Sequence, residues 1–375
     1  MTESVLLFIF CVLGGGMVAQ WAAWRFRLPA IVLLFALGLL YGPVLEILHP
    51  TKMIGPAFHS LVSLAVALIV FEGGLALDFR QLKEAGEGVI RLTLFALPIN
   101  LILGSAAAHY IGGMTWGAAF LFGAIIVVTG PTVVLPLLRH AKLHPRVAAF
   151  LRWEAIVNDP VGAILATLVL EVLLMRPDEG SGTFFGFILP HMLASAGLMI
   201  LLGIGAAWGM RWLWVRDMMP EILKIPVLIT SALVLFAMGT LAMDGAGLMA
   251  STVFGMALVN LRIPGMAEIQ RMKEALVVLI VSLLFVLLTA DLQRSELAHL
   301  SWSIGALTLA VLFLVRPLGI MLATMRSSMP WSERIFVGWI APRGIVAAAV
   351  AGVAGLRLQD AGYPGAGQVM PAVFA

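Results

Sequence analysis

The segment from Glu154 to Pro160 brings two carboxylates and one carboxamide into a run of apolar residues. On an α-helix Asn158 follows Glu154 on the same face, and Asp159 lies about 100° further round. Pro160 has no N–H group, so the carbonyl of Ile156 is released beside the acid. A carboxylate, an amide oxygen and a free carbonyl suit a small hard cation. The alternative is a proline kink with a capped polar pair that binds no ion.

The elements that must position this segment are membrane-spanning helices. Of the 375 residues, 61% are hydrophobic and only 11% are charged, against roughly 25% charged in a soluble domain. So few charges cannot form a water-exposed surface, which excludes a soluble enzyme, a nucleic-acid reader and a disordered tail. We therefore predict an all-α polytopic membrane protein with a single transmembrane domain over residues 1–375 and no cofactor.

A hydrocarbon core about 30 Å thick needs roughly 20 apolar residues in a helix. This criterion predicts about thirteen spans, of which the complete ones lie near residues 4–23, 28–48, 56–77, 88–110, 115–138, 147–174, 184–214, 223–243, 246–262, 273–290, 299–324 and 332–355. The tail from Met370 is expected to open a thirteenth span that the chain does not complete. Most Lys and Arg residues fall on one side of these spans, with Lys52, Arg176, Arg294 and Arg357 on the other. The positive-inside rule then puts the N-terminus outside and the C-terminus in the cytoplasm.

Charged side chains inside the apolar runs are the candidates for function, because each is costly at the centre of a bilayer unless it is paired or hydrated. The acids are Glu72, Glu154 and Asp159, and the deep bases are Arg316 and Arg343. We expect Glu154 to pair with an arginine. Because the acids outnumber the arginines, at least one carboxylate has no fixed cation, and we assign that position to Asp159. An unpaired carboxylate in a membrane is by default a site for a proton or a cation.

Two predicted spans contain residues that interrupt a helix. The fifth contains Thr129-Gly130-Pro131-Thr132 and the twelfth contains Ala341-Pro342-Arg343-Gly344. Irregular backbone at that depth is tolerated only against protein or a water-filled cavity. If spans one to six and eight to thirteen are inverted copies, these breaks are in the fifth helix of each. Half-helix ends that face an ion at the midplane are typical of a transporter's substrate site.

These motifs together resemble one known family. The runs Phe71-Glu72-Gly73-Gly74-Leu75, Thr129-Gly130-Pro131-Thr132, Glu154-Ala-Ile-Val-Asn158-Asp159-Pro160, Val315-Arg316-Pro317 and Pro342-Arg343-Gly344 occur in the order found in the monovalent cation:proton antiporter superfamily. Nearly the whole chain resembles its sodium/proton exchanger branch, the NhaP-type and NHE-type proteins. The Asn158-Asp159 pair is the most specific element of this resemblance.

The resemblance implies a role for each of these residues. Asp159 would be the shared ion and proton carboxylate, Asn158 would orient it, and Thr129 and Glu72 would complete the site. Glu154 would form a buried ion pair, with Arg316 as its implied partner. At the crossing of the interrupted helices, the backbone break is made by Gly130 and Pro131, and Arg343 would neutralise the half-helix ends.

Two departures from the family pattern concern ion selectivity. Many relatives have Asp where this chain has Gly130, and some have Ser where it has Ala155. A ligand or a compensating charge is therefore missing, which leaves potassium as plausible as sodium. The resemblance also implies thirteen helices in a core domain and a dimerisation domain, which move in an elevator-like cycle, usually in a homodimer.

The function predicted from this sequence is electroneutral exchange of Na⁺ or K⁺ for H⁺ at a single buried Asp in the cell (inner) membrane. The alternative is another ion-coupled secondary transporter or a channel. A channel or a carrier of organic anions would favour basic groups in the pore, whereas the unpaired buried group here is acidic. An intramembrane protease is disfavoured, because the chain lacks a His-Glu-x-x-His motif.

Overall fold

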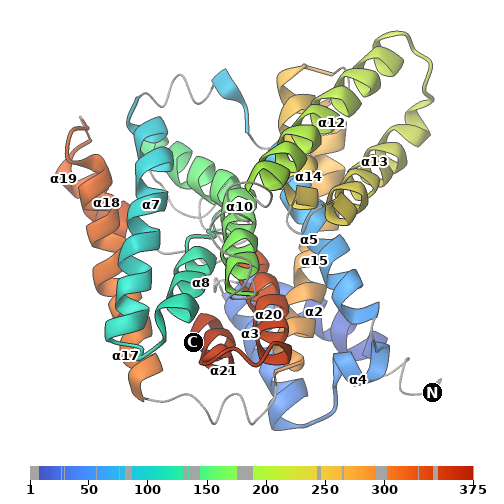
Figure 1. Cartoon of the computed structure of the whole chain (residues 1–375). Coiled ribbons are helices and arrows are strands. Elements are labelled where there is room, and N and C mark those ends of the chain that lie inside the picture. Colours follow the sequence, from blue (N-terminus) through green and yellow to red (C-terminus); the bar gives the residue numbers. More distant parts are fainter. Residues whose placement is uncertain are drawn as a thin grey trace. The chain divides into compact units, whose positions relative to one another are not determined.

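Figure 1 shows the computed structural model of the chain, and every element in its described residues is a helix. The described residues are 8–26, 28, 30–55, 57–75, 77–80, 87–129, 134, 144–174, 189–242, 246–263, 266–292, 302–327, 329–340 and 345–374. Helices are the expected outcome for such an apolar chain, because a backbone in lipid must satisfy its own hydrogen bonds.

The contacts between residues divide the chain into two compact units. The first comprises Met1–Ile69 and Gly265–His299. Its described elements are η1 (Phe10–Gly14), α2 (Gly15–Phe26), α3 (Ala30–Leu39), η2 (Leu40–Val44), α4 (Pro50–Ile54), the first part of α5 (Ala57–Leu75) and α15 (Met266–Ala290). In this unit α15 packs against α2 and α3. The side chain of Gln20 donates a hydrogen bond of 2.9 Å to the Ser282 hydroxyl, which connects α2 to α15.

The second unit comprises Val70–Pro264 and Leu300–Ala375. Besides the end of α5, its described elements are α7 (Glu87–Tyr110), α8 (Trp116–Ile126), α10 (Pro145–Leu174), α12 (Leu189–Val215), α13 (Glu221–Ala242), α14 (Ala246–Asn260), α17 (Trp302–Ala310), η4 (Val311–Val315), α18 (Arg316–Thr324), α19 (Trp331–Trp339), α20 (Ile345–Asp360) and α21 (Ala366–Phe374). Helix α7 packs against α8 and α18, and Figure 1 shows α7 and α18 side by side. Helix α10 packs against α8 and α20, while α12 and α13 pack on α14.

Several helices have nearly the predicted bounds. Helix α10 covers 145–174 and α13 covers 221–242, against predicted spans of 147–174 and 223–243. Other bounds were wrong. Helix α15 begins at Met266 rather than near residue 273, because a helix can continue through charged residues such as Arg271 beyond the apolar run that defined the span. Helix α21 begins at Ala366 rather than at Met370.

Only some of the described helices satisfy the length criterion for crossing a membrane. By length and composition, four helices of the described residues do so: Val147–Leu174, Leu193–Val215, Glu221–Ala242 and Trp302–Thr324. Shorter apolar helices are Val32–Val44, Ser60–Leu75, Phe95–Tyr110, Trp116–Ile126, Ala246–Asn260 and Val278–Ala290. The number of spans and their orientation therefore stay predictions, as does the single domain.

A buried apolar cluster in the second unit includes the residues on both sides of Glu154 in the chain. Its members are Leu77, Ala96, Val134, Val147, Phe150, Leu151, Trp153, Ala155, Ile156, Ile320, Met329 and Val337. Trp153 and Ala155 are the neighbours of Glu154 in the chain, so the cluster fixes α10 on both sides of that carboxylate. Gly338 permits close contact between α19 and α18, because a Cβ at this position would lie 3.1 Å from the Cα of Pro317.

Candidate functional site

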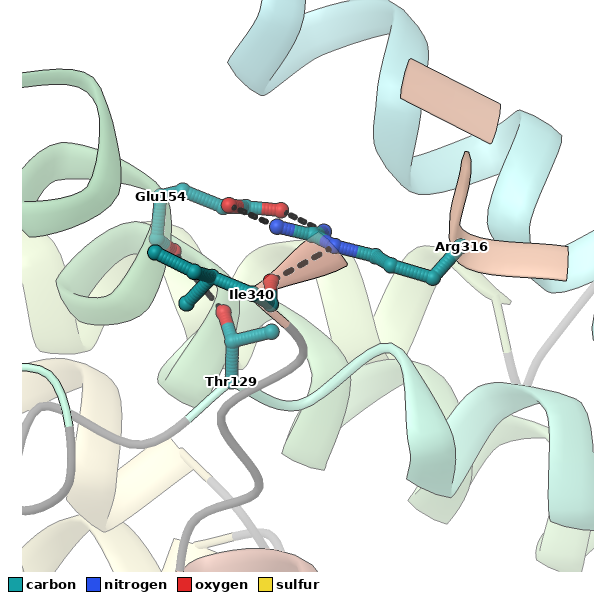
Figure 2. A network of polar contacts seen from close by, with 4 residues as sticks. All are labelled: Thr129, Glu154, Arg316 and Ile340. Carbon is teal, nitrogen blue, oxygen red and sulfur yellow. Dashed lines mark hydrogen bonds and ion pairs between the residues drawn. The ribbon is translucent and has the colours of Figure 1, made fainter. Parts of the chain in front are cut away.

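The central feature of the site is a buried ion pair between Glu154 on α10 and Arg316 on α18. The Arg316 guanidinium donates from Nη1 to Glu154 Oε1 and from Nη2 to Oε2, the latter at 2.6 Å. Figure 2 shows the two groups facing each other in this two-point contact. The Glu154 side chain is 1% exposed and the Arg316 side chain is 4% exposed. Charge-assisted bidentate pairs are the strong kind, and this geometry compensates the burial of both charges.

The local backbone and one further hydrogen bond position the Arg316 side chain for its contact with Glu154. Arg316 begins α18 directly after the π-helical turn η4, a distortion that often occurs at functional sites. Pro317 follows it and has no N–H group, as is typical of the first turn of a helix. Arg316 Nε also donates to the carbonyl of Ile340 at 3.3 Å (Figure 2). Ile340 has an extended backbone (φ −82°, ψ 106°) just after α19, so its carbonyl points away from that helix.

Thr129 connects the end of α8 to the same carboxylate-bearing helix. Helix α8 ends at Ile126, and Val127–Thr129 are not helical. The Thr129 side chain is buried, and its hydroxyl donates a hydrogen bond of 3.3 Å to the backbone carbonyl of Glu154 (Figure 2). The structure thus brings together three of the predicted site residues, namely Thr129, Glu154 and Arg316.

Asn158 lies one turn after Glu154 on α10 and is 2% exposed. Its carbonyl oxygen Oδ1 is buried, and none of the described residues donates a hydrogen bond to it. A buried carbonyl in this state needs a partner, either a donor or a cation. Asp159 follows within α10, and its side chain lies outside the described residues, as do Gly130, Pro131 and Arg343.

Glu72 lies near the end of α5, in the part that belongs to the second unit, and is 7% exposed. Gly74, two residues after Glu72, explains part of the motif that contains both residues. A Cβ on Gly74 would overlap the Thr252 carbonyl oxygen on α14 and would lie 3.1 Å from the Met256 backbone nitrogen. The Phe71 and Phe254 rings stack at 5.4 Å across the same crossing. The motif therefore positions Glu72 through close packing of α5 on α14.

Asn100 and Arg334 are among the buried polar residues that the sequence pattern did not single out. Asn100 on α7 is 8% exposed, and Arg334 on α19 is 9% exposed. Arg334 donates to the carbonyls of Met329 and Ser327, each at 2.8 Å, and so holds the segment before α19 against that helix. A polar Asn in the middle of the apolar run 88–110 was the signal that could have identified Asn100.

No group of three or more His, Cys, Asp or Glu residues that could hold a metal ion occurs in the described part of the chain. The described oxygen groups that bond to the two residues of the pair, or lie one turn after Glu154 on α10, include the Thr129 hydroxyl, the Asn158 carboxamide and the Ile340 carbonyl. Hard alkali cations bind to oxygen ligands of this kind, by extension of the preference of Ca²⁺ and Mg²⁺.

The fold resembles that of a solved membrane antiporter. It matches the solved structure of the sodium proton antiporter MjNhaP1 from Methanocaldococcus jannaschii with a TM-score of 0.86. That match has 23% sequence identity and covers 100% of this chain and 96% of the other. The chain thus has the fold of a membrane antiporter.

The sequence then identifies the family. The model of the family described as "Sodium/hydrogen exchanger, transmembrane" matches residues 7–366. The chain therefore belongs to the sodium/hydrogen exchanger family, whose members are transporters and not enzymes. This confirms the family resemblance seen in the motifs.

Curated relatives include both sodium and potassium antiporters. The Na⁺/H⁺ antiporter 1 of Methanocaldococcus jannaschii is 25% identical over 356 residues, which cover 92% of this chain and 81% of that protein. A probable Na⁺/H⁺ antiporter 2 of the same organism is 24% identical, with 90% and 81% covered. The K⁺/H⁺ antiporter NhaP2 of Shewanella sp. strain ANA-3 is 26% identical, and the match covers 86% of this chain but only 55% of that protein.

Proposed function

We propose that this chain exchanges a monovalent cation, Na⁺ or K⁺, for H⁺ by competition at the carboxylate of Asp159. The observation that carries the proposal is the two-point pairing of Glu154 with Arg316. A carboxylate whose two oxygens are both held by a guanidinium is not free to exchange a proton for a cation. The next acid on α10 is Asp159, so it is the group left for the exchange.

The neighbouring oxygen atoms support a cation at this position. Asn158 Oδ1 is buried without a donor from the described residues, and it adjoins Asp159 in the chain. Thr129 is held at the Glu154 carbonyl, one turn before Asn158. Glu72 is buried in the same unit. We infer that Asp159 binds the ion, that Asn158 orients it, and that Thr129 and Glu72 complete the polar surroundings.

The mechanism that follows requires only one exchanging group. A proton or a cation, but not both, neutralises the carboxylate. The site can cross the membrane when it is loaded or protonated, whereas the bare anion cannot, because an uncompensated charge is too costly in lipid. One proton then exchanges for one monovalent cation, and the cycle is electroneutral.

The proposed architecture supports alternating access. We infer inverted repeats with interrupted helices at Thr129-Gly130-Pro131-Thr132 and at Ala341-Pro342-Arg343-Gly344. The end of α8 at Ile126 and the end of α19 at Trp339, followed by the extended Ile340, are consistent with these breaks. Arg343 would neutralise the half-helix ends. We further propose an elevator-like homodimer in the cell membrane, with the N-terminus outside and the C-terminus in the cytoplasm.

The direct test is flux in proteoliposomes that contain the purified protein, with Na⁺, K⁺ or Li⁺ added against a preset pH gradient. Wild-type protein should dissipate the gradient with at least one of these cations, and Asp159→Ala should abolish the response. Thermal melting of the variant in detergent provides the control for folding. Wild-type exchange from folded Asp159→Ala would overturn the role of Asp159. Cation flux without proton movement would support a channel instead.

A further inference from the structure

A small cavity lies beside the buried ion pair and has no assigned role. It has a volume of about 10 Å³, and its lining residues are Asn100, Ile126, Val127, Thr129, Val315 and Arg316. All of them belong to the second unit. A cavity of roughly 10–15 Å³ can hold one water molecule if at least two polar partners surround it. The volume therefore suits one water and nothing larger.

Asn100 supplies the first polar partner. It is 8% exposed, and its Oδ1 atom receives no hydrogen bond from any residue in the described ranges. A buried carbonyl without a donor carries a desolvation penalty, and such groups in native proteins are generally satisfied by protein or ordered water. A water in the cavity would donate the hydrogen bond that this atom lacks.

Arg316 supplies the second polar partner. A guanidinium carries five N–H groups, and within the described part of the chain its acceptors are the two Glu154 carboxylate oxygens and the Ile340 carbonyl. Figure 2 shows one acceptor at each of the three nitrogens, so two of the five N–H groups have no acceptor among these. An N–H group that they do not use can donate to a water in the cavity that Arg316 lines.

The same lining disfavours an ion. The positive guanidinium would repel a cation at contact distance, since charges interact strongly in a low-dielectric interior. The Asn100 carbonyl oxygen would repel an anion, and the volume is too small for a hydrated one. Thr129 already donates its hydroxyl hydrogen to the Glu154 carbonyl, so it can only accept from the cavity. Water alone among these species can both donate and accept here.

Helix packing places Asn100 at this position. Gly319 lies three residues after Arg316 and hence on the same face of α18. A Cβ on Gly319 would overlap Asn100 Oδ1 and would lie 2.8 Å from Asn100 Cγ. The glycine therefore lets the carboxamide from α7 lie directly against α18, one turn from the guanidinium.

We propose that this cavity is a water site, in which one ordered water accepts a hydrogen bond from Arg316 and donates one to Asn100 Oδ1. Asn100 is then a positioning residue: through the water, it holds the guanidinium in the orientation that pairs with Glu154. The inference concerns the packing of the ion pair and does not depend on which ion is transported or on Asp159.

The first test replaces Asn100 with leucine, which has a similar size and no polar atom. If the water bridges Asn100 to Arg316, Asn100→Leu breaks the bridge and lowers the melting temperature of the full chain in detergent. If Asn100 Oδ1 has no partner, the substitution removes an unsatisfied carbonyl and the melting temperature stays the same or rises, which would overturn the proposal. Ser105→Ala, on the same helix, is the control, since among the described residues its hydroxyl donates to the Leu101 carbonyl of its own helix.

The second test is a rescue that a general packing defect would not produce. Glu154→Gln leaves Arg316 without its carboxylate, and adding Asn100→Asp would offer a new one from the cavity that both residues line. We expect the double variant to regain at least half of the melting temperature lost by Glu154→Gln, although Asn100→Asp alone lowers it. A double variant that is no more stable than Glu154→Gln would overturn the position assigned to Asn100.

The water itself is tested by an experimental map of the wild-type protein at a resolution that shows ordered waters. The expected result is a peak within about 3.2 Å of both Asn100 Oδ1 and an Arg316 nitrogen. Gly319→Ala should displace the Asn100 amide and remove the peak, whereas Gly305→Ala, where a Cβ would meet nothing within 4 Å, should leave it. A wild-type cavity without density would refute the water site.

Discussion

Replacing Glu154 with glutamine isolates the contribution of the buried ion pair. The substitution keeps the size of the side chain but removes the charge that compensates Arg316, whose side chain is 4% exposed. The glutamine oxygen and the Ile340 carbonyl remain as acceptors, but both are neutral and cannot compensate the charge of Arg316. Stranding a buried charge in this way costs about 3–5 kcal/mol of unfolding free energy.

The magnitude converts into a measurable shift. With an unfolding entropy of about 2.1 cal/mol/K per residue, a cooperative transition of all 375 residues corresponds to roughly 0.8 kcal/mol/K. We therefore expect Glu154→Gln to lower the melting temperature by about 4–6 °C. The measurement is thermal unfolding of purified protein in one detergent at a fixed scan rate.

Two control variants separate the buried pair from a general effect of charge. Glu221→Gln removes a carboxylate that pairs with Lys224 and is 74% exposed, and exposed pairs contribute about 0–1 kcal/mol. Its melting temperature should shift by no more than about 1 °C. Replacing both Glu154 and Arg316 with leucine removes both charges, so this double variant should recover most of the stability lost by Glu154→Gln.

One result would refute this reasoning. If Glu154→Gln melts at the wild-type temperature while transport is lost, Arg316 does not depend on Glu154 for its charge compensation. Glu154 would then become the candidate for direct ion binding. Its pairing with Arg316 would no longer be a reason to assign the exchange to Asp159.

Further predictions concern charge transport and packing. If one proton exchanges for one cation at Asp159, a membrane potential clamped with valinomycin should leave the rate of Na⁺/H⁺ exchange unchanged, provided that K⁺ is not itself a substrate. A rate that depends on voltage would show that a second acid also carries protons, and Glu72 is the first candidate. Gly74→Leu should lower the melting temperature and the yield of folded protein, because a side chain there meets the α14 backbone. Gly197→Leu, where a Cβ meets nothing within 4 Å, is its control, and equal stability of the two variants would contradict the close crossing. Thr129→Val removes a buried hydrogen bond to the Glu154 carbonyl and should cost about 1 kcal/mol of unfolding free energy, detectable as a small fall in melting temperature; no change would show that the bond contributes nothing.

The sequence by itself determined the class of this protein and the approximate course of its helices. A content of 61% hydrophobic and 11% charged residues permits few structures other than a helical membrane protein. The bounds of α10 and α13 followed from apolar runs, since the length of such a run depends only on local composition. The order of the charged and proline-containing motifs was sufficient to predict the family, which the family match over residues 7–366 confirmed.

Local pattern could not determine which groups meet across the fold. The residue types left Arg316 and Arg343 as alternatives for Glu154, and only the packing of α18 against its neighbours put Arg316, 162 positions further along the chain, at the carboxylate. The same is true of the Thr129 hydroxyl on the Glu154 carbonyl and of Asn100 against Gly319. A hydrogen bond requires atoms within about 3 Å, and helices far apart in sequence reach that precision only when their side chains have packed together. Tertiary structure therefore decided the partners, although the sequence had already named most of the residues.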